Sequence, residues 1–487
     1  MVRIKILYQL TLLILIINLG CYKDNSTISS IPMPKILLSE DEWGSGTKRL
    51  VYLGEKSNIH CNILWGNEDS TKFDFVWHLN DSLISTERDL HYVFNETGEF
   101  CVSFQVIERT TGLSVGTSLS ITVSSKFLLG WLILSEKEGH SALDFIHIDT
   151  HELYPNIYST LYPNDKLGSS PYRLEEHFTN AYDQIMVMQK GGPGCILLDG
   201  RNFKKVIRNV DEFIGEKYPY EGFEPKQICY ANGASSGVEI LLSTKGEVFI
   251  RLNKTNVSKF QTAQYPTIPI EYPDGKGMRI SYFTFPKPTF QLMFDDLNKR
   301  WLAIYKSSNN DQILPPLLKK YDDNDYPDFF DFCNGMPNNI DLVYAQTCDE
   351  WSKVILINIL KNKSTHSLYL QKSILYYNPS TKRVEVSNPL QLEFGNGYAI
   401  DENSEFWMLR GQNTYFQDSP HIFFNIENKI YFYRLQNNKI YLYKDFSMNK
   451  NAPKGKIVAI HTNPRTTELG IAFSDDISSY VTQKQSV

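Results

Sequence analysis

Two groups of residues in this chain have types and spacing that could do chemistry, and the first is a serine in a glycine-rich pentapeptide. Ser235 stands inside Gly233–Gly237, which matches the G-x-S-x-G pattern of a nucleophilic serine. That chemistry requires a strand before the serine and a helix after it, whereas Val238–Leu242 favours a strand. We therefore interpret the pentapeptide as a loop and expect no catalytic residue.

The second group lies in residues 308–339, a stretch that is acidic, aromatic and interrupted by proline. It is too long for an ordinary connection, and long ordered loops are often functional. Asp323, Asp325 and Asp328 are dense enough for calcium, but their spacing is not that of an EF-hand, so we interpret them as solvated residues and expect no metal or cofactor. The aromatic residues of this loop either hold it on the body or form a stacking platform for a ligand; they are Tyr321, Tyr326, Phe329 and Phe330.

The chain contains seven cysteines, which could be free thiols or form disulfides. Cys21 stands apart, and none of the other six lies in a CxxC pair or has a histidine at zinc-site spacing, which favours structural thiols or a few disulfides. Cys333 and Cys348 flank one loop-like segment and are the candidate disulfide pair.

The N-terminus has the features of a secretion signal. Arg3 and Lys5 precede the apolar run Ile6–Leu19, which is shorter than the roughly 20 residues that span a bilayer, and Gly20 stands directly before Cys21. This arrangement resembles the lipobox of a Gram-negative lipoprotein precursor, although Asn18 stands where leucine is usual. The resemblance implies a signal peptide over residues 1–20 and acylation of Cys21. The alternative is an ordinary signal peptide with a chance cysteine.

The rest of the chain predicts an all-β protein. After a polar, flexible tether over residues 21–34, residues 35–125 contain about seven short alternating strands, which predicts a β-sandwich. The sequence has no long basic run and a net charge of −6, which excludes nucleic acid as a partner. Helix signals are sparse, and Tyr172–Tyr182 is the best short candidate.

One pattern recurs along residues 127–487. It consists of a strand, a turn and a second strand. About seven such units of roughly 50 residues predict a β-propeller-like domain of about seven blades. A large irregular sandwich, or two stacked sandwiches, is the alternative. The units lie at the Trp131 hairpin, Ile185–Ile207, Val238–Leu252, Phe290–Tyr305, Ile340–Leu370, Lys429–Tyr443 and Ile457–Phe473.

A second resemblance lies in the predicted sandwich. Phe75–Asn80 and Gly98–Val106 are similar to the W-x-L-N and G-x-Y-x-V-x-L-x-V strands of PKD-like domains. Cys61, Trp77 and Cys101 also follow the Cys, Trp, Cys order of immunoglobulin domains, but Cys101 alternates with the inward residues while Cys61 is in register with them, which argues against a core disulfide.

The hairpin that follows, GWLILSE with SALDFI, completes a pattern similar to PKD-like lipoproteins encoded beside SusC/SusD-type outer-membrane uptake systems. The resemblance implies a lipid-anchored, surface-exposed outer-membrane protein that joins a SusC/SusD-like transporter complex as a non-catalytic accessory and binds a glycan or peptide. Two alternatives remain open: a propeller enzyme, such as a glycoside hydrolase or lyase, that acts on an extracellular polymer, and a scaffold that binds only neighbouring proteins.

Overall fold

The computed structural model describes residues 33–37, 48–178, 183–214, 223–231, 237–253, 264–284, 287, 289–305, 312–314, 316–350, 353–401, 403–408, 421–447, 455–462, 469–474 and 480–484. The predicted signal peptide, Cys21 and most of the predicted tether lie outside these residues. The chain divides into two compact units, Met1–Ser124 and Ser125–Val487. No helix in the described ranges is long and apolar enough to cross a membrane.

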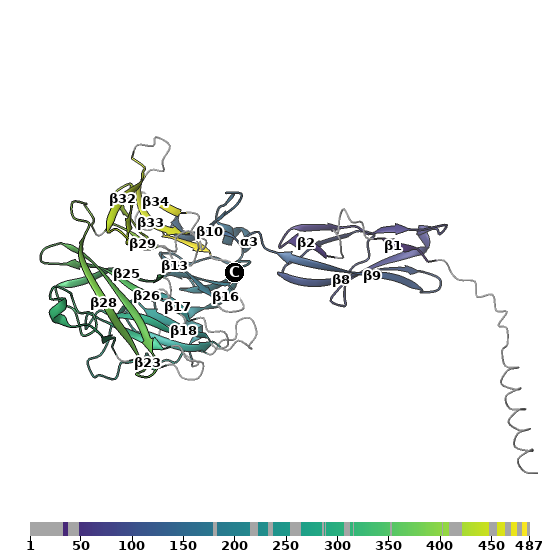
Figure 1. Ribbon diagram of the computed structural model, residues 1–487. Helices are drawn as coiled ribbons and strands as arrows, with labels where there is room; N and C mark the ends of the chain where they lie inside the picture. Colours follow the sequence, from purple (N-terminus) through teal and green to yellow (C-terminus); the bar gives the residue numbers. More distant parts are fainter. Residues whose placement is uncertain are drawn as a thin grey trace, which may run out of the picture. The chain divides into compact units, whose positions relative to one another are not determined.

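The first unit is a β-sandwich (Figure 1). Its five-stranded sheet has the order β2-β9-β8-β5-β6, and two smaller sheets pair β1 with β4 and β3 with β7. The elements are β1 (Lys35–Leu37), β2 (Lys48–Tyr52), β3 (Lys56–Ile59), β4 (Asn62–Leu64), the 3-10 helix η1 (Ser70–Lys72), β5 (Phe73–Leu79), β6 (Ser82–Ser85), β7 (Leu90–Val93), β8 (Gly98–Glu108) and β9 (Ser114–Ser124).

The sandwich core forms around Trp77, which is fully buried against Phe104 at 4.3 Å between ring centroids. The Trp77 indole N–H donates to the Glu87 carbonyl at 3.0 Å, so the ring is buried without an unsatisfied donor. Cys61 lies in this core, whereas Cys101 is exposed. The expectation from strand phase, that these cysteines do not form a core disulfide, is therefore confirmed.

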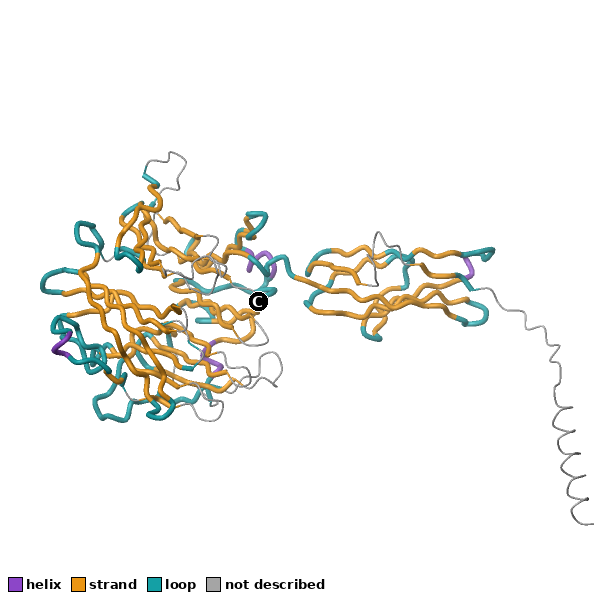
Figure 2. Tube along the Cα trace, viewed as in Figure 1, coloured by secondary structure: helices purple, strands orange, loops and turns teal. Residues whose placement is uncertain are grey.

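In its described residues the second unit contains seven sheets, which we name blades 1 to 7 in chain order. Figure 2 shows how strands dominate the unit. Blade 1 contains β10 (Gly130–Lys137), β11 (His140–His147), β12 (Leu153–Tyr154) and β35 (Tyr480–Lys484), and is followed by α3 (Ile157–Leu161). Blade 2 contains β13 (Pro171–Phe178), β14 (Asp183–Gln189), β15 (Ile196–Asp199) and β16 (Lys205–Arg208), then η2 (Asn209–Glu212). Blade 3 contains β17 (Pro225–Ala231), β18 (Gly237–Ser243) and β19 (Val248–Asn253).

The remaining blades complete the unit. Blade 4 contains β20 (Ile280–Phe283), β21 (Phe290–Asp295), β22 (Arg300–Tyr305) and β23 (Gln312–Leu314). Blade 5 contains β24 (Leu318–Lys319), β25 (Ile340–Glu350), β26 (Lys353–Asn362), β27 (Leu368–Asn378) and β28 (Arg383–Phe394), with η3 (Asp323–Asp325) after β24. Blade 6 contains β29 (Phe406–Met408), β30 (His421–Ile426), β31 (Lys429–Arg434) and β32 (Lys439–Asp445), and blade 7 contains β33 (Lys456–Thr462) and β34 (Leu469–Ser474).

Each blade is apolar on both faces because it is buried between two neighbours. In β18, Leu241 packs into the core shared with blade 2, whereas Ile240 and Leu242 pack into the core shared with blade 4. Similarly, Met293 of β21 faces blade 3, and Leu292 faces blade 5. Burying a side chain of this size stabilises the fold by about 1.5–3 kcal/mol, so the packing between successive blades stabilises the unit.

The two ends of the second unit meet in blade 1. Strand β35 pairs antiparallel with β10, from Gly130 opposite Lys484 to Leu134 opposite Tyr480, and also lies beside β13 and β33. The Trp131 ring packs on Gly470 of β34, where an added Cβ would come within 2.5 Å of the ring. Blade 7 therefore contacts blade 1, as expected of a propeller-like arrangement.

The predicted all-β class, with a PKD-like sandwich followed by a propeller-like unit, is confirmed. Each of the seven strand–turn–strand units expected from the sequence falls in a different blade. The helix expected at Tyr172–Tyr182 was wrong, because residues 171–178 form β13, the first strand of blade 2.

Candidate functional site

One strand in each of several blades shares an irregularity. Pairing skips one residue near the start of β13, β17, β20, β25 and β33, at Tyr172, Lys226, Ser281, Val343 and Val458. Such β-bulges redirect neighbouring side chains and are common beside functional sites. Three of these strands are also neighbours, since β13 lies beside β17 and β17 beside β20. The bulges therefore bring side chains from different blades to one region.

Arg173 is the centre of this region. It pairs across the strand with Met188 and Glu175 pairs with Met186, so both charged side chains lie on the face of blade 2 that is turned toward blade 3. Glu175 accepts from Nε and Nη2 of Arg173. Burial by itself would lower the pKa of the Arg173 guanidinium. The charge of Glu175 and its hydrogen bond raise that pKa by more, so the net shift is upward and Arg173 stays charged. Its side chain is still 43% exposed, so solvent reaches it.

Tyr282 of blade 4 and Gln346 of blade 5 link two neighbouring blades. The Gln346 side-chain amide donates to the Tyr282 hydroxyl at 3.2 Å. Burial raises the pKa of Tyr282, and the charge of Arg173 opposes that shift. Because the Tyr282 oxygen accepts from Gln346, its own proton is available to another acceptor.

Lys226 and Glu405 complete the group from blade 3 and from the residue directly before β29 of blade 6. Burial lowers the pKa of Lys226, and the like charge of Arg173 lowers it further. Burial raises the pKa of Glu405, although the charge of Arg173 opposes the shift. Among the described residues neither side chain has an ion-pair partner, and Glu405 is exposed to solvent.

We name these residues the inner-strand cluster: Arg173, Glu175, Lys226, Tyr282, Gln346 and Glu405. They come from five blades. Solvent reaches Arg173, Lys226 and Glu405, and burial shifts the pKa values of Lys226, Tyr282 and Glu405. Perturbed ionisable groups in such surroundings are typical of binding and catalytic sites. The cluster contains two cations, Arg173 and Lys226, and two carboxylates, Glu175 and Glu405, so it offers both donors and acceptors to a polar ligand.

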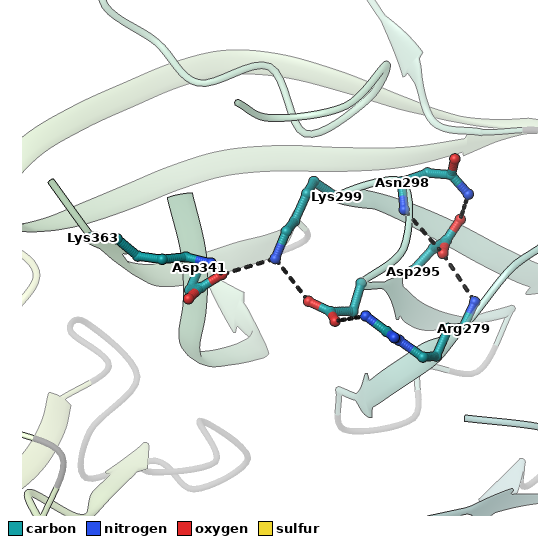
Figure 3. A network of polar contacts seen from close by, with 7 residues as sticks. Arg279, Asp295, Asn298, Lys299, Asp341 and Lys363 are labelled. Carbon is teal, nitrogen blue, oxygen red and sulfur yellow. Dashed lines mark hydrogen bonds and ion pairs between the residues drawn. The ribbon is translucent and has the colours of Figure 1, made fainter. Parts of the chain in front are cut away.

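A network of ion pairs beside the cluster joins blade 4 to blade 5 (Figure 3). Lys299 contacts Asp296 at 2.9 Å and Asp341 at 2.8 Å. Arg279 also contacts Asp296 at 2.8 Å, and Lys363 contacts Asp341 at 3.1 Å. Burial alone would raise the pKa of Asp296, but its hydrogen bonds with Lys299 and Arg279 hold it below the usual value. The network holds the turn between β21 and β22 against the start of β25.

A second polar cluster is fully enclosed beside blade 3. Arg251 of β19 contacts Glu212 at 2.8 Å and Glu239 of β18 at 2.5 Å, and its guanidinium lies 4.2 Å from the centroid of the Tyr265 ring. All four side chains are at most 5% exposed. Burial raises the pKa of Glu212, and the charge of Glu239 adds to the shift although Arg251 opposes it. Since solvent does not reach it, we interpret this cluster as structural.

The aromatic residues of the 308–339 loop mostly face the body of the protein. Tyr321, Phe329 and Phe330 pack against the core between blades 4 and 5. Tyr321 contacts the Phe329 ring at 5.6 Å, and Phe330 contacts the Tyr369 ring at 5.2 Å. Only Tyr326 is exposed among the four, at 37%. Three of the four predicted ligand-contacting residues therefore hold the loop in place.

The acidic residues of the same loop are dispersed. Asp323 and Asp331 both contact Lys319, and Asp328 contributes its carbonyl to a hydrogen bond from Gln391. Asp325 is exposed. Within the described ranges no group of three or more His, Cys, Asp or Glu residues could hold a metal ion.

The predicted Cys333–Cys348 disulfide is absent, and this prediction was wrong. Cys333 is buried in the core between blades 4 and 5, whereas Cys348 is buried in the core between blades 5 and 6. They lie on opposite faces of blade 5, so no bond between them can form. The sequence showed that they flank a loop but not that a sheet separates them.

Sequence reasoning missed the inner-strand cluster. Residues Arg173 and Glu175 fell in the segment that was expected to be a helix, and the other members are single polar residues in separate segments of the chain. Lys226 and Tyr282 lie before the repeat units located at Val238–Leu252 and Phe290–Tyr305, so the repeat pattern did not include them. The serine of the G-x-S-x-G pattern lies outside the described residues, but Gly237 begins strand β18, which confirms the expected strand after it.

The sequence matches the model of the PKD-like family over residues 21–171. This range covers the sandwich and continues through β10, β11 and β12 of blade 1. No curated protein matches the sequence.

Several solved structures are similar at low identity. The β-propeller domain of Nup133 from Vanderwaltozyma polyspora matches at 9% identity with a TM-score of 0.36, over 78% of this chain and 89% of that one. The WD40 domain of SCAP from fission yeast matches at 9% with a TM-score of 0.32, over 71% and 83%. An auxiliary nutrient binding protein from Bacteroides thetaiotaomicron matches at 10% with a TM-score of 0.27, over 84% and 86%. At these scores the assignment of the propeller-like unit depends on its own strand pairing and on the packing between its blades.

Proposed function

We propose that this protein is a lipid-anchored binding protein on the surface of the outer membrane, that it serves a SusC/SusD-type uptake system for a glycan or peptide, and that it catalyses no reaction. The observation that carries the proposal is the match to the PKD-like family over residues 21–171. That range begins at Cys21 and includes the Trp131 hairpin, the two features on which the resemblance to SusC/SusD-associated lipoproteins rests.

The propeller-like unit would supply the binding. The inner-strand cluster offers hydrogen-bond donors from several blades to solvent, and tethering on one membrane can supply effective concentrations near millimolar, on the order of 10⁻³ M. Weak binding beside a transporter would therefore be sufficient.

The proposal is tested by affinity isolation of the full-length protein from detergent-solubilised outer membrane of its native host. We expect SusC- and SusD-like subunits to co-purify. If the protein is isolated in good yield and no transporter subunit accompanies it, the accessory role is wrong. If subunits accompany it but no glycan or peptide binds, a scaffold is the correct function.

The lipid anchor gives a separate prediction. Replacing Cys21 by Ala should release the protein from the membrane fraction, because several acyl chains anchor stably at about 0.8 kcal/mol per buried CH₂. The matched control is Cys101→Ala, since Cys101 is an exposed cysteine that the proposal does not use. Fractionation after a high-salt wash measures the result, and an intact Cys21→Ala protein that stays membrane-bound contradicts the anchor.

A propeller enzyme is the second candidate, and one observation favours it. The raised pKa of Glu405 and the lowered pKa of Lys226 are the directions that suit a general acid and a general base. Turnover of a glycan or peptide that is lost in Glu405→Gln would establish the enzyme and overturn the non-catalytic proposal.

A further inference from the structure

Blade 6 ends in an aromatic edge that lies at the opposite side of its sheet from the inner-strand cluster. Strand β32 is the last strand of this sheet, and among the described strands none pairs with its outer edge. Its tyrosines Tyr441 and Tyr443 are 37% and 53% exposed. Tyr441 pairs with Phe432, which packs in the core shared with blade 7, so its ring lies on the face of blade 6 that is turned toward blade 7.

The Tyr441 ring is held in one orientation. It stacks on Phe432 at 5.2 Å between centroids, and its hydroxyl accepts from the Asn437 side-chain amide at 2.7 Å. The Arg434 guanidinium lies 5.7 Å from the centroid of the same ring. Phe432 and Arg434 both belong to β31, so these contacts come from the sheet, and the other side of the ring is turned toward the open edge.

Tyr443 lies on the same face as Tyr441. Its ring contacts Phe423 at 5.3 Å and Phe432 at 6.5 Å, both in edge arrangements, and both partners belong to the core shared with blade 7. The two tyrosines therefore form an exposed pair of rings along one strand, already fixed by packing. Rings that are fixed before binding lose little conformational entropy when a ligand stacks on them.

The backbone of β32 is poorly suited to pairing with a peptide. Pairing with β31 skips Tyr443, so a bulge interrupts the strand, and the exposed lysines Lys439 and Lys444 flank the two rings. Bulges and lysines are the features by which edge strands prevent the addition of another strand. A peptide that binds by extending the sheet is therefore disfavoured.

A sugar fits the same surface, because it is apolar on the C–H face of its ring and polar at the rim. The exposed rings of Tyr441 and Tyr443 supply an apolar surface. Around them, Lys439 and Lys444 offer charged donors, and the outer edge of β32 offers backbone N–H and C=O groups. Two rings along one strand suit a chain of sugars that is itself straight and flat.

We propose that Tyr441 and Tyr443 form a stacking platform for a flat, β-linked glycan chain that lies along the outer edge of β32. This inference rests on the proposed function, since it selects the glycan from the two ligand classes named there. The platform is separate from the inner-strand cluster, because Glu405 of that cluster directly precedes β29, the strand at the other edge of blade 6.

The test measures binding of cellohexaose to the purified full-length protein by isothermal titration calorimetry. Maltohexaose is the comparison, because it contains the same sugar in a curved, α-linked chain. We expect cellohexaose to bind at least tenfold more tightly, since stacking on a second ring contributes about that factor. Absence of cellohexaose binding, or equal binding of maltohexaose, overturns the proposal. Tighter binding of a heptapeptide with alternating valine and threonine between two lysines also overturns it.

Variants identify the platform. Tyr443→Ala should weaken cellohexaose binding about tenfold, whereas Tyr443→Phe keeps the ring and should retain most of the affinity. Tyr398→Ala is the matched control: Tyr398 is 39% exposed and contacts Tyr431, which packs in the core on the blade 5 side of blade 6. Thermal melting confirms that each variant is folded. Wild-type affinity in folded Tyr443→Ala, or an equal loss in Tyr398→Ala, overturns the platform.

The outcomes separate this inference from the proposed function. If transporter subunits co-purify with the protein while Tyr443→Ala binds cellohexaose as the wild type does, the inference fails and the accessory role stands. If cellohexaose binds through Tyr443 but no transporter subunit co-purifies, the accessory role fails and the glycan platform stands.

Discussion

At the scale of single residues, the enclosed cluster around Arg251 shows how a buried charge constrains the fold. Two carboxylates, Glu212 and Glu239, depend on one guanidinium in a place that solvent does not reach. Replacing Arg251 by Met should lower the free energy of unfolding by about 3–5 kcal/mol, because it leaves buried carboxylates without their cation. Urea denaturation of the full-length protein measures this. A loss below about 1 kcal/mol, the effect of an ordinary surface substitution, would show that the cluster is not stabilised by Arg251.

Glu212 gives a prediction on pH dependence. Burial raises its pKa in the folded protein, so the folded state binds this proton more tightly than the unfolded state. The stability that this bound proton adds to the folded protein is fully present below the pKa that Glu212 has in the unfolded chain. It is lost as the pH rises through the higher pKa that Glu212 has in the folded protein. Glu212→Gln cannot ionise, so its stability relative to wild type should increase as the pH rises from acidic to neutral.

The neighbouring Asn209 makes this substitution suitable. Its side-chain amide donates to Glu212 at 2.8 Å, and its own oxygen is buried without a partner. A rotation of the Asn209 amide would let that oxygen accept from the introduced amide group. Thermal melting of both proteins across the pH range is the measurement, and a constant difference at every pH contradicts the assignment.

At the scale of elements, the loop between β24 and β25 is held in place by aromatic contacts with the core between blades 4 and 5. Phe329 contacts Tyr321 and Phe332, each at 5.6 Å between centroids, whereas Tyr326 is exposed. Phe329→Ala should therefore cost about 1.5–3 kcal/mol of stability. Tyr326→Ala should change stability by less than about 0.5 kcal/mol, as exposed positions do.

These two variants also separate the structural role of the loop from a role in binding. Weaker ligand binding in Tyr326→Ala, with unchanged stability, would support the ligand role predicted for this residue. Equal loss of stability in both variants, measured by chemical denaturation, would contradict the packing described for the loop.

At the scale of the whole second unit, stability depends on strands from its two ends. Strand β10 pairs with β11 on one side and with the C-terminal strand β35 on the other. A chain that begins at Lys126 keeps both pairings and should fold. A chain that begins at Asp144 loses β10, so β35 has no strand to pair with and the core between blades 1 and 2 loses Leu132 and Leu134.

Circular dichroism and thermal melting of the two shortened proteins test this prediction. The chain that begins at Lys126 should melt cooperatively, and the chain that begins at Asp144 should melt at a lower temperature or without cooperativity. Equal melting temperatures would show that β10 does not hold the two ends of the unit together.

The sequence by itself determined the features that depend on near neighbours along the chain. Alternation of apolar residues with period two predicted the sandwich, and the phase of Cys61 and Cys101 correctly assigned one inward and the other outward. Turn residues between apolar strands located seven hairpins, for example at Asn438, which has the positive φ of 55° that a tight turn requires. These features are local because side-chain direction and turn geometry depend on only a few consecutive residues.

Only the tertiary structure decided which distant residues meet. It placed Cys333 and Cys348 on opposite faces of one sheet, and it paired β10 with a strand almost at the other end of the chain. It also placed the strands that carry Arg173, Lys226 and Tyr282 beside one another, each with a bulge that shifts the register by one residue. A bulge has no strong sequence pattern, and the meeting of first strands depends on the packing of whole blades. The candidate site therefore follows from non-local packing, which no short stretch of this sequence specifies.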